Sequence, residues 1–161
     1  MGNSKEEILV NEALSILKNI FKEKGYYGNC FFEEGNYQFS YKEKPFNIFI
    51  PLIIKCNSKP LLIVDYKPQE NLILSERGII ALARVFFDPP PYFALITNLK
   101  DFVLIDVYTQ KKEKGGKEII PDFSEIKKYE PKLIKNFNLE IEKKILAIYL
   151  SGGWKGGVCR L

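Results

Sequence analysis

The sequence contains no histidine, and its three cysteines, Cys30, Cys56 and Cys159, form no CxxC pair. Zinc sites use Cys and His ligands, and a nucleophilic cysteine needs a histidine base, so both kinds of site are excluded. Any metal ion must therefore be held by oxygen ligands, which favours Mg²⁺ or Mn²⁺. Acid–base chemistry would depend on Asp, Glu, Lys or Tyr.

A long hydrophobic run is also missing from the sequence. No apolar stretch reaches the roughly 18 residues that cross a bilayer, so no membrane partner is expected. The N-terminal segment MGNSKEEILV carries Glu6 and Glu7 where a signal peptide would be apolar. These features predict a cytoplasmic protein. Methionine and glutamine are scarce while Ile, Lys and Glu are abundant, which is typical of a thermophilic source.

What is present suits one globular domain: 161 residues, of which 46% are hydrophobic and 27% are charged. The net charge of +4 comes almost wholly from lysine, since arginine occurs only at positions 77, 84 and 160. A mildly basic chain is compatible with a polyanionic partner such as DNA. A thermophilic composition would also explain the lysine excess, so the net charge alone does not show whether the protein binds DNA.

The order of the sequence patterns predicts an α/β protein. An apolar stripe after Ser4 and Glu7 indicates a capped helix, and the run NIFIPLIIK is typical of a strand in which Pro51 requires an edge position or a bulge. The predicted elements, in chain order, are helix 4–24, strands 37–41, 47–55 and 59–67, helix 70–87, strands 92–98 and 102–109, and helix 138–150.

This order predicts a three-layer α-β-β-β-α-β core with a mixed central sheet over residues 1–110. Residues 111–161 add a basic loop, a C-terminal helix and a glycine-rich tail, which we expect to pack on the same domain. The charged segment QKKEKGGKE (110–118) is predicted to be a solvated, mobile loop, and the end SGGWKGGVCRL is predicted to be loose. Asp122, in IPDF, is expected in a turn before a helix.

The stretch KPLLIVDYKP, residues 59–68, ends an apolar strand with two opposite charges. Strand alternation places Asp65 and Lys67 on one face, roughly 6–7 Å apart along the strand. If the preceding strand forms a hairpin that turns near Asn57, Phe49 faces Asp65 and Asn47 faces Lys67. A buried charge is unfavourable unless it is paired or functional, so this strand end is the first candidate site.

Two interpretations of the Asp65–Lys67 pair remain open on the residues alone. The carboxylate can hold a divalent cation while the ammonium polarises a phosphoryl oxygen, which suits phosphodiester chemistry. Alternatively, the pair is a partly solvated ion pair that contributes ~0–1 kcal/mol and has no further role.

The run KPLLIVDYKP, a following helix and PPPYFALITNLKDFVLIDVYTQKK together resemble the N-terminal nuclease-like domain of type I restriction enzyme R subunits and the small stand-alone proteins related to it. These belong to the PD-(D/E)xK superfamily, whose core has the order α-β-β-β-α-β. The resemblance covers about residues 8–110. It implies a restriction-endonuclease-like fold and Mg²⁺-dependent DNA hydrolysis, with Asp65 as the metal-binding acid and Lys67 as its electrostatic helper.

The sequence departs from the family in two places. The family's first aspartate should precede Asp65 by roughly 10–20 residues, but residues 44–64 contain no Asp or Glu. A Gln-x-x-x-Tyr element on the next helix is also missing, with Gly78 and Leu82 in its window. The alternative to a nuclease is therefore a catalytically degenerate nuclease-fold protein that acts as a DNA-binding or assembly module.

Other acids and amides could replace the missing aspartate. Asn47 offers a neutral oxygen, and Glu12 lies on the first helix, where some members of the superfamily place a metal-binding glutamate. For Glu12 a solvated position is the simpler interpretation. Glu33 and Glu34, before the first predicted strand, are a further option.

Basic residues near this core are candidate DNA contacts. Arg77 and Arg84 share one helical face and could either bind phosphate or lie solvated on a flank. The charged loop carries Lys111 and Lys112, followed by Lys114 and Lys117, and could add non-specific affinity for a nucleic-acid backbone. A homodimer or another protein partner also remains open.

Overall fold

A computed structural model describes residues 5–68, 72–131 and 137–151. The strands are β1 (Cys30–Tyr41), β2 (Lys44–Cys56), β3 (Lys59–Tyr66), β4 (Phe93–Thr97), β5 (Phe102–Asp106) and β6 (Lys112–Gly115). The helices are α1 (Lys5–Glu23), α2 (Ile73–Phe86), α3 (Phe123–Lys128) and α4 (Leu139–Ser151), with a 3-10 turn at Lys117–Ile119.

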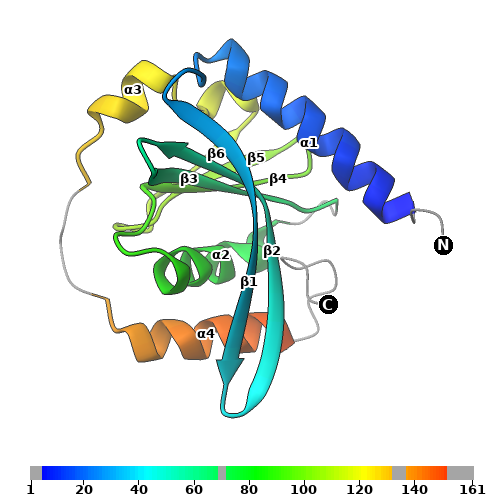
Figure 1. The fold of residues 1–161 in the computed structure, drawn as a ribbon, viewed down its shortest axis with the longest axis vertical. Coiled ribbons are helices and arrows are strands. Elements are labelled where there is room, and N and C mark those ends of the chain that lie inside the picture. Colours follow the sequence, from blue (N-terminus) through cyan, green and yellow to red (C-terminus); the bar gives the residue numbers. More distant parts are fainter. Residues whose placement is uncertain (1–4, 69–71, 132–136, 152–161) are drawn as a thin grey trace.

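The six strands form one mixed sheet in chain order, β1 to β6 (Figure 1). Every neighbouring pair is antiparallel except β3 and β4, which are parallel and joined by α2. A parallel pair needs such a crossover because the chain must return to the starting edge. The predicted α/β class with a mixed sheet is therefore confirmed. Within the described residues, no helix is long and apolar enough to cross a membrane.

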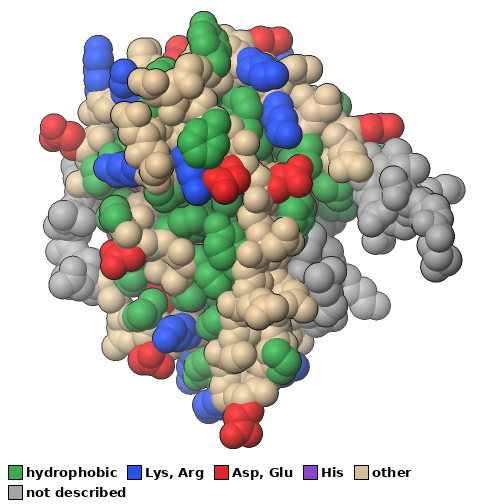
Figure 2. Space-filling view, viewed as in Figure 1, with side chains coloured by type: hydrophobic (Ala, Val, Ile, Leu, Met, Phe, Trp, Pro, Cys, Tyr) green, Lys and Arg blue, Asp and Glu red, His purple; other side chains and the backbone are tan. Residues whose placement is uncertain are grey.

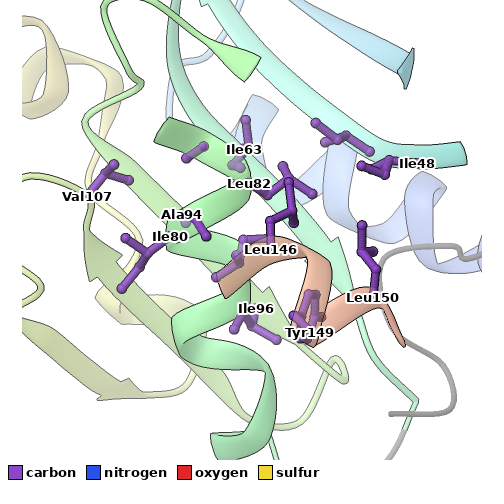
Figure 3. Close-up of a cluster of buried hydrophobic side chains, with 14 of the residues drawn as sticks. Ile48, Ile63, Ile80, Leu82, Ala94, Ile96, Val107, Leu146, Tyr149 and Leu150 are labelled. Carbon is purple, nitrogen blue, oxygen red and sulfur yellow. The ribbon is translucent and has the colours of Figure 1, made fainter. Parts of the chain in front are cut away.

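Helices cover both faces of the sheet (Figure 1). On one face, α1 and α3 bury Leu17, Phe21 and Ile126 against β2, β3 and β4. On the other face, α2 and α4 pack together on the sheet and bury Leu82 and Leu146, as Figure 3 shows. The side chain at each strand position thus faces one helical layer or the other.

The β1–β2 hairpin is longer than the sequence predicts, because the broken, aromatic stretch after Cys30 pairs along its whole length with β2. Gly35 permits this close pairing: a Cβ there would lie 2.5 Å from the Tyr37 ring and 2.8 Å from Ile53. The register shifts between Glu33, opposite Ile53, and Gly35, opposite Ile50. The bulge expected from Pro51 is therefore present in β2.

The register proposed for the β2–β3 hairpin was wrong by two residues. Ile53 lies opposite Ile63, and Leu52 lies opposite Val64. The chain turns through Asn57 and Ser58, which both have positive φ, as a two-residue hairpin turn requires. Phe49 and Asn47 therefore do not face Asp65 and Lys67 as the sequence suggested, and neither is among the β2 residues that pair with β3.

The predicted mobile loop at 110–118 is also wrong, because Lys112–Gly115 forms the edge strand β6 on β5. Its lysines and glycines suggested a loop, but charged residues are common on exposed edge strands. Asp106 shapes the turn before it by accepting hydrogen bonds from the N–H groups of Tyr108 (2.8 Å) and Thr109 (2.9 Å). Asp122 precedes α3, as expected, and the tail from 152 lies outside the described residues.

Candidate functional site at the end of β3

Strand β3 positions the two charged residues that the sequence singles out. Asp65 alternates with Val64, so it lies on the same face as Ile63, under α2 and α4. The Lys67 N–H donates to the Thr97 carbonyl (2.9 Å), which continues the pairing with β4 one residue past the strand. Lys67 Nζ lies 3.1 Å from Asp65 Oδ2, so the expected pair does form on one face.

This pair is sealed from solvent. The exposed fraction is 2% for the Asp65 side chain and 0% for the Lys67 side chain. Tyr149 of α4 covers them, with its ring centroid 5.5 Å from Lys67 Nζ, and Figure 3 shows Tyr149 within the apolar cluster beneath the sheet. Gly78 of α2 leaves space for that ring, because a Cβ there would lie 2.3 Å from Tyr149 Cγ. The open cleft that hydrolysis requires is absent around the described pair.

Burial dominates the electrostatics of both groups. Loss of water raises the pKa of the Asp65 carboxyl, and the nearby ammonium only partly offsets this. Burial would lower the pKa of Lys67, but the Asp65 charge and Tyr149 outweigh it and raise that pKa. The ammonium is therefore held in its charged form by a carboxylate that is itself poorly solvated. Asp65 Oδ2 is ion-paired but accepts no hydrogen bond of good geometry within the described chain.

The residues around Asp65 do not fit a Mg²⁺ site. The described residues contain no group of three or more His, Cys, Asp or Glu side chains arranged to hold a metal. Mg²⁺ requires near-octahedral oxygen coordination and usually keeps several waters. Asp65 instead presents one carboxylate, already paired with an internal cation, in a position closed to water. The pair therefore supports no catalytic step through a metal.

The other candidate ligands do not join Asp65. Asn47 is exposed, pairs with Gln38 of β1, and alternates with the buried Ile48, so it faces away from the α2–α4 layer. Glu12 is exposed on α1, and that helix covers the opposite face of the sheet. Glu33 forms an ion pair with Lys55 (2.6 Å). Of the candidates named from the sequence, the structure brings only Asp65 and Lys67 together.

The two α2 arginines bind an acid inside the protein. Arg84 Nη1 lies 2.9 Å from Glu142 Oε2, and Arg77 Nη2 lies 2.8 Å from Glu142 Oε1. Arg84 is buried and also donates from Nε and Nη2 to the Val107 carbonyl (3.0 and 2.6 Å). The pair does share one helical face, but that face meets α4. For Arg84, both interpretations from the sequence, a phosphate contact and a solvated position on a flank, are therefore wrong.

Lysines at the β6 edge are partly neutralised. Lys112 Nζ donates to Glu76 Oε1 (2.7 Å), and Lys114 Nζ lies 3.9 Å from Glu76 Oε2, while Lys111 is exposed. A groove of about 510 Å³ beside them has acidic and basic lining, including Glu76 and Lys100, and neither Asp65 nor Lys67 lines it. On the face shown in Figure 2, basic side chains are scattered among acidic ones rather than gathered in one patch.

Sequence reasoning missed Tyr149 and Glu142, and it named Gly78 without a packing role; these three residues determine the surroundings of the candidate site. Gly78 was a usable signal, because a glycine inside an apolar helical pattern often marks close packing by a neighbour. Glu142 gave a weaker signal in the sequence. It is an acidic residue on a predicted helix, and it meets the two arginines only once the chain has folded. Comparison with protein-family models, curated proteins and solved structures finds no match to this chain.

Proposed function

We propose that this chain is a restriction-endonuclease-like protein whose nuclease site has degenerated and which acts as an assembly module. The observation that carries the proposal is the Asp65–Lys67 pair, which is closed beneath α4 and belongs to no group of three or more Asp, Glu, His or Cys side chains among the described residues. A phosphodiester must reach both the metal ligand and the lysine, and the sealed pair offers neither to solvent.

The order of the elements supports the fold assignment. The chain runs α1, β1, β2, β3, α2, β4, which is the core order of the family that its motifs resemble. The Asp and Lys of the motif lie at the end of β3, beside the parallel strand β4. The place of the motif in the sheet therefore supports the proposed fold.

The surroundings of the basic residues favour a protein partner over DNA. Arg77, Arg84 and Lys112 are ion-paired with acids of the same chain. Counterion release by free lysines and arginines supplies most non-specific affinity for DNA, and paired side chains contribute less of it. These three residues therefore give little support to DNA binding, and of the two non-catalytic roles we propose assembly with protein.

Mg²⁺-dependent DNA hydrolysis is the second candidate, favoured by the retention of Asp65 and Lys67 side by side at the strand end. Incubation of plasmid and linear DNA with Mg²⁺ or Mn²⁺ separates the two. We expect no cleavage above the level given by Lys67→Met, with Lys111→Met as the matched exposed control. Cleavage by the wild type and by Lys111→Met, lost in a Lys67→Met protein with an unchanged circular dichroism spectrum, would establish the nuclease instead.

A further inference from the structure

The outer edge of the sheet at β1 is long and lacks the usual protection. β1 has twelve residues, contains no lysine, arginine or proline, and has its two charged residues, Glu33 and Glu34, side by side in its first half. The other edge, β6, has four residues, two of them lysines. Exposed edges are normally kept short or charged because their free N–H and C=O groups template pairing with another chain. Among the described residues, β1 is therefore the edge that is open to a further strand.

The hairpin turn fixes which groups of β1 face outward. Tyr41 and Lys44 flank a two-residue turn whose residues, Lys42 and Glu43, both have positive φ. In such a turn the flanking pair is hydrogen-bonded, and pairs then alternate along the ladder. Asn36, Gln38 and Ser40 fall at the alternate positions, where the N–H and C=O groups point away from β2.

Two observations agree with that assignment. Pro45, which has no N–H, lies opposite Ser40, where the β2 backbone is not needed for bonding to β1. Asn36, Gln38 and Ser40 are exposed and uncharged. Within the described chain, no backbone hydrogen bond outside the ladder reaches these three residues.

We propose that β1 pairs antiparallel with β1 of a second copy of this chain, about a two-fold axis at Gln38. The proposal deepens and rests on the assembly function above, because it names the partner. In this register Gln38 meets its own symmetry mate and Asn36 meets Ser40 of the other copy, which satisfies the outward N–H and C=O groups of both strands. Two six-stranded sheets then join into one.

Charge complementarity selects a second copy in this register. Glu34 lies four residues before Gln38 and Lys42 four residues after it, so each Glu34 faces Lys42 of the other copy, giving two such pairs. Glu33, which faces the turn residue Glu43, is already neutralised by Lys55 (2.6 Å). Within one chain, Glu34 and Lys42 are separated by roughly 26 Å of extended strand, too far to interact.

Sedimentation equilibrium of the full chain tests the proposal by charge reversal. We expect the wild type to dimerise, and Glu34→Lys or Lys42→Glu to weaken dimerisation by at least about fivefold, because each places like charges in both pairs. The double variant Glu34→Lys/Lys42→Glu restores two opposite-charge pairs and the wild-type net charge, so its dimer should recover. Glu12→Lys, an exposed reversal on α1, is the matched control and should dimerise as the wild type does.

A wild type that stays monomeric, reversals that leave the dimer unchanged, or a double variant that fails to recover would each overturn the pairing. Gln38→Pro gives a second check, since it removes the central N–H without altering charge and should also abolish the dimer. The DNA cleavage assay is independent of these results. A monomer that does not cleave DNA contradicts only this pairing, and a dimer that cleaves DNA contradicts only the non-catalytic function.

Discussion

Asp65 and Lys67 carry opposite charges in a place that water does not reach, and their role follows from this. An exposed ion pair contributes little to stability and leaves both groups available to a ligand. A buried pair has lost its hydration, so each charge depends on the other, and removal of one leaves the second uncompensated. The same two residues that resemble a catalytic element therefore act as an internal pair beneath Tyr149.

The sequence predicted one part of this arrangement and not the other. Alternation along β3 correctly placed both side chains on one face, because that depends only on local strand geometry. Their burial depends on Tyr149 and Gly78, which come from two different helices. Local patterns could not show that these helices meet over the pair.

The ionisation of Asp65 gives a prediction about pH. Burial raises the pKa of its carboxyl in the folded state, so the folded chain binds the proton more tightly than the unfolded chain. The stability that Asp65 contributes should fall as pH rises from the ordinary value of 3.8 through the raised folded-state pKa. Urea unfolding of the wild type and Asp65→Asn, from about pH 4 to about pH 8, measures this.

We expect the free energy of unfolding of the wild type, relative to Asp65→Asn, to decline over that range. A difference that does not change with pH would mean that the carboxyl titrates alike in the folded and unfolded chains. A difference that grows with pH would mean that Lys67 lowers the pKa more than burial raises it.

At the scale of elements, the contact between α2 and α4 is the feature that the local sequence patterns predict least well. Each helix was predicted close to its observed bounds: 70–87 corresponds to Ile73–Phe86, and 138–150 corresponds to Leu139–Ser151. The helices meet through an apolar cluster and through Glu142, which lies between Arg77 and Arg84. Such a partnership between distant segments leaves no periodic signal in either one.

Gly78→Ala tests the close approach of these helices. The added methyl would lie 2.3 Å from Tyr149 Cγ, so the ring or the helix must move. Alanine favours an exposed helix interior by about 1 kcal/mol over glycine, but overpacking a core is unfavourable by roughly 1–3 kcal/mol. We expect a net loss of stability in chemical denaturation. A more stable Gly78→Ala would show that Tyr149 does not pack against α2.

Glu142→Gln tests the buried acid between the arginines. It leaves two guanidinium groups without their counter-charge, and Arg84 is buried, so the expected loss is about 3 kcal/mol or more. Glu140→Gln is the matched control, because Glu140 is exposed on the same helix and its ion pair with Lys143 is at the surface. The control should change the unfolding free energy by less than about 0.5 kcal/mol. Equal effects of the two variants would contradict the claim that Glu142 stabilises the fold as a counter-charge of the two arginines.

At the scale of the whole molecule, the order of strands and helices was predictable and the edges were not. Apolar runs and the helix between β3 and β4 sufficed to indicate a mixed sheet. The β6 strand escaped prediction because its residues are charged and include a glycine. Its partner is the backbone of β5, which a local sequence pattern does not reveal. β1 was predicted too short because Gly28, Gly35 and Pro45 made the segment around it resemble a broken, irregular stretch.

A double-mutant cycle on the pair tests most directly the claim that it belongs to the core. The free energy of unfolding is measured for the wild type, Asp65→Asn, Lys67→Met and the variant that carries both changes. We expect each single change to lower it by about 3–5 kcal/mol, and the double variant to lose much less than the sum, because it leaves no charge unpaired. Single losses below about 1 kcal/mol that simply add would describe solvated groups facing a cleft, and would contradict the account.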